Sequence, residues 1–130
     1  MLKLADIVIV NESKVEATAG DVTIFRSVEA VCNYLEHWWV EDGEGFAFTA
    51  TGERLKLGVD EQSKVVVVNR EAAPDGETLV YNWLSTTAIA VLEARRFKAA
   101  RGKVVLSQSE QEGQLPTSIE EIISYVGFTR

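Results

Sequence analysis

Residues 27–53 read SVEAVCNYLEHWWVEDGEGFAFTATGE and predict a helix followed by a β-hairpin. A helix is expected to begin at Ser27, because serine is favoured at helix N-caps. Apolar residues then recur at the spacing of one helical face, at Val28, Val31, Cys32, Leu35, Trp38 and Trp39. Residues 38–40 are expected to leave this helix as extended chain, and a turn containing glycines follows. Alternating apolar residues over 46–50 then predict the first strand of a β-hairpin.

Other segments of the N-terminal half have the composition of strands. β-Branched residues dominate 6–10 and 21–25, and residues 55–59 alternate as the second strand of the hairpin. Residues 65–68 are four consecutive valines, which is typical of a strand buried on both faces. Because short turns separate these segments, the strands are expected to pair antiparallel.

The C-terminal half has a helical period. Apolar residues from Val80 to Leu92 follow one face, which predicts a long helix from roughly Glu77 to Arg101. The alternative makes Thr78–Leu84 a strand and starts the helix at Ser85.

The segments after the long helix are short. Residues 103–107 are predicted to form one more strand, and residues 108–114 a mobile polar loop. Thr117 and Glu120 have the spacing of a capping box, which predicts a last helix that begins there. Gly127 is expected to stop this helix.

These elements predict a single α+β domain over residues 1–130. Its antiparallel sheet is expected to have six to eight strands. Both a flat and a strongly curved sheet fit this pattern. The helix that begins at Ser27 and the long helix are both expected to pack on one face of this sheet. The short C-terminal helix would close an edge or an end of the core.

Composition limits the kind of protein. The chain has 46% hydrophobic residues and one cysteine, which fits a reduced, cytoplasmic protein. Its apolar runs fall short of the ~20 residues that a membrane span needs, so no membrane association is expected. The net charge of −7 argues against a nucleic-acid partner, because phosphate binding needs clustered lysines and arginines.

The acidic, aromatic window is the main candidate for a binding site. Between Arg26 and Arg54 there are six carboxylates and no lysine or arginine, together with five of the eleven aromatic residues. Such residues are typical of a surface that recognises a basic protein partner. The candidate binding residues are Glu36, His37, Trp38, Trp39, Glu41, Asp42 and Glu44.

The sequence favours two core indoles for the adjacent Trp38 and Trp39, with the exposure of one indole as the alternative. His37 has its helical neighbour at Asn33 and is expected to be solvated rather than catalytic. Cys32 lies on the apolar stripe and is expected to be a buried structural thiol.

No cofactor, metal or catalytic site is predicted. The acids of residues 41–44 lack the ligand spacing of a calcium loop. Five bases cluster near the C-terminal end of the predicted long helix. They are expected to stabilise that helix end, where positive charge is favourable, and an anion site is the alternative. They are Arg95, Arg96, Lys98, Arg101 and Lys103.

A family resemblance lies in the same part of the chain. Residues 24–30, 34–36, 40–48 and 51–55 form a strand, an S-V-E-A helix start, an acidic glycine turn and a hairpin. This pattern resembles one found in small bacterial proteins, some of them candidate immunity proteins of polymorphic toxin systems. It lies within residues 24–55 and carries structural rather than catalytic residues. The resemblance implies a non-enzymatic protein whose acidic surface occludes a toxin.

Three functional hypotheses follow. The leading one is a binding or immunity-type protein that uses the acidic, aromatic surface of residues 36–46. The alternative is a small-molecule or enzymatic pocket between the first helix and the sheet, lined by Tyr34, Trp38, Trp39, Phe46 and Trp83. The third is self-association into a homodimer through edge strands.

Overall fold

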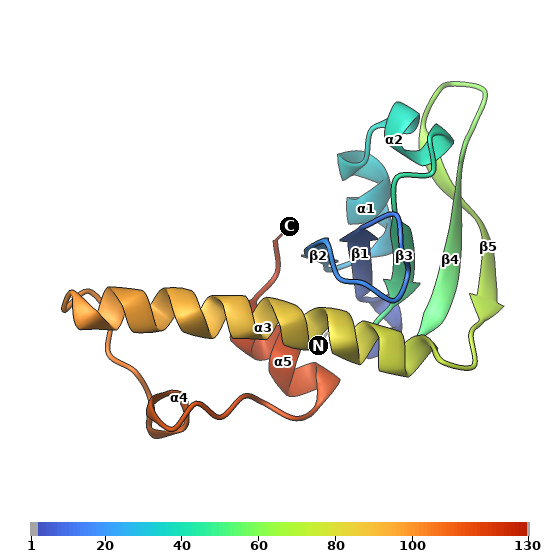
Figure 1. Cartoon of the computed structure of the whole chain (residues 1–130). Helices are drawn as coiled ribbons and strands as arrows, with labels where there is room; N and C mark the ends of the chain where they lie inside the picture. Colours follow the sequence, from blue (N-terminus) through green and yellow to red (C-terminus); the bar gives the residue numbers. More distant parts are fainter. Residues whose placement is uncertain (1–2, 130) are drawn as a thin grey trace.

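The computed structural model describes residues 3–129, in which five strands form one antiparallel sheet of order β2-β1-β3-β4-β5 (Figure 1). The strands are β1 Val8–Glu12, β2 Asp21–Phe25, β3 Phe46–Thr49, β4 Glu53–Val59 and β5 Val65–Ala72. The helices are the 3-10 turn η1 Leu4–Asp6, α1 Val28–Tyr34, α2 His37–Glu41, α3 Gly76–Ala100, α4 Gln108–Gln111 and α5 Ile119–Val126. The α+β class and the antiparallel sheet are confirmed, but the predicted six to eight strands are not found in the described part of the chain.

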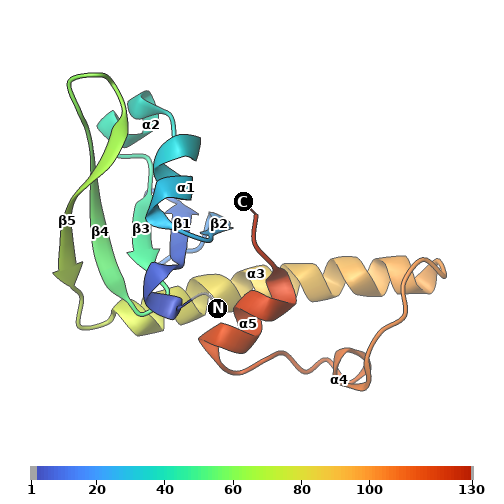
Figure 2. The same ribbon diagram turned by 180° about the vertical axis from the view of Figure 1, so that it is seen from behind.

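Helices cover both faces of the sheet. Successive side chains of a strand point to opposite faces, so Val8 and Val10 of the interior strand β1 pack with α1, while Ile9 packs with α3 and α5. The prediction that the first helix and the long helix share one face is therefore wrong. The apolar residues of β1 contribute to a core on each face of the sheet. The helix α1 packs on one face, and α3 and α5 pack on the other (Figures 1 and 2).

The apolar stripe of residues 28–39, which was predicted to lie on one helix, is divided between two helices, α1 and α2. The Ser27 hydroxyl accepts a hydrogen bond from the N–H of Ala30 at 3.1 Å, which confirms the predicted N-cap. The helix α1 ends at Tyr34, because Leu35 is extended at φ −72° and ψ 136°. A second helix, α2, then contains residues 38–40, which the sequence predicted to be extended. Helices this short depend on packing rather than on propensity, and here the break buries Leu35 in the core below α1.

The four-valine strand is an edge strand. Val65 is 5% exposed, whereas Val68 is 62% exposed, so the prediction of burial on both faces is wrong. The pairing of β5 with β4 changes register between Lys56 and Leu57, which leaves Val68 without a residue opposite it. A run of valines occurs both in interior strands and in edge strands. The sequence of the run does not tell the two apart, because the position of the strand in the sheet decides its burial.

The helix α3 is continuous through Thr78–Leu84, as predicted. Its first half buries Val80, Trp83 and Leu84 against the sheet, and its second half extends beyond the sheet (Figure 1). A methyl group at Gly76 would lie 1.8 Å from the carbonyl oxygen of Gly52, so the start of the helix touches the backbone of the β3–β4 turn.

The C-terminal segment differs from the predicted strand and loop. Residues 103–107 form turns and irregular chain, and the predicted mobile loop contains the helix α4. The helix α5 is capped by Ser118, whose hydroxyl accepts from the N–H of Glu121 at 3.1 Å, and not by Thr117. Thr117 and Ser118 are both capping residue types with a glutamate three positions later, so their spacing fits both registers.

The chain beyond α5 covers the outer edge of β2. Gly127 ends α5 with φ 85°, which confirms the predicted stop. The N–H of Thr129 then donates to the carbonyl of Ile24 at 3.0 Å, and the guanidinium of Arg26 lies 4.5 Å from the ring centre of Phe128. The C-terminal residues thus cover the end of this edge strand at Ile24.

Candidate functional site

The two tryptophans of α2 have different environments. Trp38 is 53% exposed, whereas Trp39 is half-buried and packs on the core below α1. A methyl group at Gly45 would lie 2.7 Å from the Trp39 ring, so that ring rests directly on the backbone of the turn before β3. The favoured expectation of two core indoles is therefore wrong, and the alternative of one exposed indole is confirmed. Adjacent residues in a helix point about 100° apart, which accounts for the difference.

Two hollows flank the exposed indole and share Trp38, Trp39 and Glu12. The first, which we call the aromatic hollow, has a volume of about 240 Å³ and is lined by Glu12, Tyr34, Leu35, Glu36, Trp38 and Trp39. The second, which we call the outer hollow, has a volume of about 520 Å³ and is lined by Glu12, Ser13, Lys14, Asp21, Trp38, Trp39 and Glu44. The indole of Trp38 thus forms part of the wall of both.

The charges of the two hollows differ. Of the described residues, none that lines the aromatic hollow is basic, and Glu12 and Glu36 supply two carboxylates. The outer hollow has three carboxylates and one lysine, Lys14. Glu12 ends β1 and Asp21 begins β2, so the fold brings acids to this surface from outside the window that the sequence singled out. No spacing rule in the sequence could have found them, because strand pairing places them there.

The seven candidate residues are not all brought together. Those that line the two hollows are Glu36, Trp38, Trp39 and Glu44, and those that do not are His37, Glu41 and Asp42. His37 Nδ1 lies 2.9 Å from a carboxylate oxygen of Glu41, and both side chains are exposed. The predicted neighbour of His37 was Asn33, but the break between α1 and α2 lies between them.

A third hollow lies where the sheet opens between β3 and β4. These strands pair only at Ala47 with Leu55 and at Phe48 with Arg54, whereas β4 continues beside β5 to Val59. The hollow has a volume of about 380 Å³, and its apolar walls include Trp39, Val40, Phe46, Ala47, Leu55 and Leu57. Glu44, Arg54, Lys56 and Glu71 supply its charged groups.

The five aromatic residues that were predicted to line one pocket are separated. Trp39 and Phe46 line the hollow between β3 and β4, but Tyr34 and Trp38 do not. Trp83 is fully buried on the opposite face of the sheet, where its ring lies edge-on to Phe48 and its Nε1–H donates to the carbonyl of Glu16 at 2.8 Å. The helical period placed Trp83 on the correct face of α3 but could not show which face of the sheet that helix covers.

Cys32 is half-buried rather than buried in the core. Partial burial raises the pKa of the Cys32 thiol, which disfavours the nucleophilic thiolate. Across residues 3–129, no group of three or more His, Cys, Asp or Glu side chains is placed to hold a metal ion.

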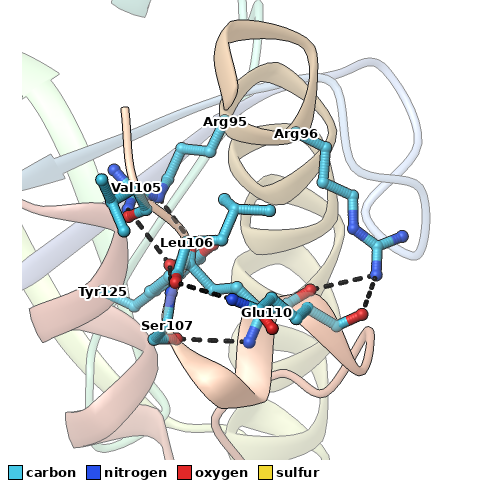
Figure 3. A network of polar contacts seen from close by, with 8 residues as sticks. Arg95, Arg96, Val105, Leu106, Ser107, Glu110 and Tyr125 are labelled. Atoms are coloured by element: carbon cyan, nitrogen blue, oxygen red, sulfur yellow. Dashed lines mark hydrogen bonds and ion pairs between the residues drawn. The ribbon is translucent and has the colours of Figure 1, made fainter. Parts of the chain in front are cut away.

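The sequence missed a polar network around Glu110, which is 5% exposed (Figure 3). Its carboxylate accepts hydrogen bonds from the Arg95 guanidinium, from the N–H of Ser107 at 3.0 Å and from the Tyr125 hydroxyl at 2.8 Å. The Arg95 hydrogen bond, followed by that from Ser107, lowers the pKa of Glu110 to about 2.

Arg96 also binds this segment, by donating to the carbonyl of Glu110 at 3.0 Å (Figure 3). Two of the five clustered bases thus hold the C-terminal segment against α3. The spacing Ser107–Glu110, a capping box like the one predicted at Thr117, was the available signal for this network.

No helix within residues 3–129 is long and apolar enough to cross a membrane. Comparison of the chain with protein-family models, with curated proteins and with solved structures finds no match.

Proposed function

We propose that this chain is a non-enzymatic binding protein that recognises a basic protein partner through one surface. That surface, which we call the acidic-aromatic surface, consists of Glu12, Asp21, Tyr34, Glu36, Trp38 and Glu44. The observation that carries the proposal is the exposed indole of Trp38, which stands between two hollows that four carboxylates line.

Two physical arguments support this function. Tryptophan and tyrosine are enriched among the residues that dominate binding energy, and an exposed indole has a large apolar area to bury against a partner. Tyr34, which is 44% exposed, lies beside Trp38 and extends that area. The surrounding carboxylates favour approach of a positively charged surface and disfavour an acidic one.

The resemblance of parts of residues 24–55 to small bacterial proteins, some of them candidate immunity proteins, supports a narrower form of this proposal. An immunity-type protein would occlude a basic toxin with its acidic-aromatic surface. The residues that carry the resemblance include Tyr34, Glu36 and Glu44 of this surface, whereas Glu12, Asp21 and Trp38 lie outside them.

The proposal is tested by affinity capture from the native cytoplasm with the intact chain and with Trp38→Ala. The control is Phe97→Ala, because Phe97 is 60% exposed but lies on the half of α3 that projects from the sheet. We expect the intact chain and the control to retain the same partner and Trp38→Ala to lose it. Equal capture by all three proteins would contradict the proposal.

A second candidate function is small-molecule binding in the hollow between β3 and β4. Its volume of about 380 Å³ falls within the range of ligand sites, and its apolar walls carry a few charged groups. Native mass spectrometry of the purified chain would detect a co-purified small molecule, and Leu57→Trp, which adds bulk at a half-buried lining residue, should abolish its retention. Unchanged retention by this variant would place the ligand elsewhere.

A further inference from the structure

The aromatic hollow has the composition of a receptor for a single cation. Three of its six lining residues are aromatic, two are glutamates, and the sixth, Leu35, is a buried residue of the core below α1. We infer that the aromatic hollow accepts one cationic side chain of the partner, the guanidinium of an arginine or the ammonium of a lysine. This inference rests on the proposed function, because it names the group by which the basic partner is held.

The charges select a cation over other ligands. Among the ion pairs of the described residues, none involves Glu12 or Glu36, so within residues 3–129 neither carboxylate forms a salt bridge. An anion would be repelled by both, and a neutral apolar group would gain nothing from them. A cation over the face of an indole is attracted by the ring, and a nearby carboxylate adds to that attraction.

The size of the hollow favours a single side chain. Its volume of about 240 Å³ lies below the range of about 300–1,000 Å³ that is typical of drug-sized ligands and cofactors. Lysine and arginine have long stems that pack against apolar surface while the charged head keeps polar partners. Tyr34, Leu35 and Trp39 supply that surface, and the carboxylates supply the partners.

The break between α1 and α2 builds the hollow. Tyr34 is the last residue of α1, Leu35 and Glu36 are extended, and Trp38 is the second residue of α2. A single continuous helix would carry Tyr34 and Trp38 on one face, one turn apart, with no extended residues between them. The carboxylate of Glu12 comes from the end of β1, so three elements of the fold converge on one hollow.

The outer hollow makes an internal comparison. It shares the indoles of Trp38 and Trp39, and its three carboxylates and Lys14 give it the same net charge as the two carboxylates of the aromatic hollow. The aromatic hollow adds the ring of Tyr34 and has no ammonium beside its carboxylates, so the cation is expected there and not beside Lys14.

The test uses N-acetyl-arginine-N-methylamide and its lysine counterpart, titrated into the ¹⁵N-labelled chain at millimolar concentration. The three indole N–H resonances report separately on Trp38, Trp39 and the buried Trp83. We expect saturable shifts of the Trp38 resonance and no shift of the Trp83 resonance. The neutral citrulline analogue, which keeps the shape of arginine without its charge, should bind at least about threefold more weakly.

Variants locate the site. Glu12→Gln with Glu36→Gln should weaken binding of the arginine probe by about threefold or more, because both carboxylates line the hollow. The matched control, Glu41→Gln with Asp42→Asn, removes the same charge from the last residue of α2 and from its C-cap, neither of which lines the hollow. This control should leave binding nearly unchanged. Retention of the Trp83 resonance shows that each variant is folded.

The outcomes separate this inference from the proposed function. Non-saturable shifts, equal binding of the citrulline analogue, or equal effects of the two double variants would overturn the cation pocket. If affinity capture still depends on Trp38 in that case, the acidic-aromatic surface stands and only the pocket is wrong. If capture does not depend on Trp38 while the probe still binds saturably, the pocket stands as a cation site and the protein-binding proposal is wrong.

Discussion

The guanidinium of Arg95 donates two hydrogen bonds to the carboxylate of Glu110, and this pair fastens the C-terminal segment to the half of α3 that extends beyond the sheet. The same carboxylate is bound by the Tyr125 hydroxyl of α5. Three segments therefore meet at one side chain, and Tyr125 joins them to the core that α3 and α5 form with the sheet.

Replacement of Glu110 by Gln is expected to lower the melting temperature by several degrees. An amide cannot form the charged pair with Arg95, and its NH₂ group is a donor where Tyr125 and Ser107 also donate. Thermal unfolding followed by circular dichroism measures the change. Tyr125→Phe, which removes one hydroxyl of the same network, should cost less, and an unchanged melting curve for Glu110→Gln would show that the network does not belong to the cooperative unit.

The pH dependence of stability has a definite sign. The pKa of Glu110 lies at about 2 in the fold, below its ordinary value of 4.5. A carboxyl group whose pKa is depressed by folding contributes stability that is full above about pH 4.5 and is lost as pH falls toward about 2. The stability difference between the native chain and Glu110→Gln should therefore shrink over this window in denaturant titrations. A difference that stays constant down to about pH 2 would contradict the assigned pKa.

Leu35→Ala should destabilise the chain by about 2–5 kcal/mol. Leu35 is 8% exposed at the junction of α1 and α2, where it packs in the core below α1 and lines the aromatic hollow. Urea denaturation measures the loss. A loss below about 1 kcal/mol would mean that the junction is not packed as described.

The two capping residues of α5 should respond differently. Ser118→Ala should cost about 0.5–2 kcal/mol, because it removes the acceptor for the N–H of Glu121. Thr117→Ala should be nearly neutral, since Thr117 is exposed and precedes the cap. The reverse order in matched melting curves would restore the capping box predicted from the sequence.

Local chemistry could be predicted from the sequence wherever one segment decides the outcome. The N-cap at Ser27, the continuous helix through Thr78–Leu84 and the stop at Gly127 each depend on residues within a few positions. The break after Tyr34 could not be predicted, because no glycine or proline marks it and packing of Leu35 decides it.

The candidate site was predicted in the same uneven way. Trp38 and Glu36 could be chosen from the local pattern, since the window is acidic and aromatic. Glu12 and Lys14 could not, because Glu12 ends β1 and Lys14 follows it, and only the folded sheet brings this end of β1 beside α2. Glu41 and Asp42 were predicted as binding residues because they are close in sequence to Trp38, but they do not line either hollow. Proximity in sequence therefore included residues that lie outside the site and missed residues that the fold brings to it.

Recognition of a basic partner through the acidic-aromatic surface is tested by the rate of association with the captured partner at two ionic strengths. The variant carries Glu12→Gln, Glu36→Gln and Glu44→Gln, and the control carries Glu77→Gln, Glu93→Gln and Glu120→Gln, which remove the same charge from exposed positions of α3 and α5.

Stability should change little in either protein, because exposed charges contribute little. At low salt the variant should associate roughly three- to tenfold more slowly than the native chain, with a flatter salt dependence, while the control should match the native chain. Equal association rates and equal salt dependence for the variant and the control would contradict recognition through the acidic-aromatic surface.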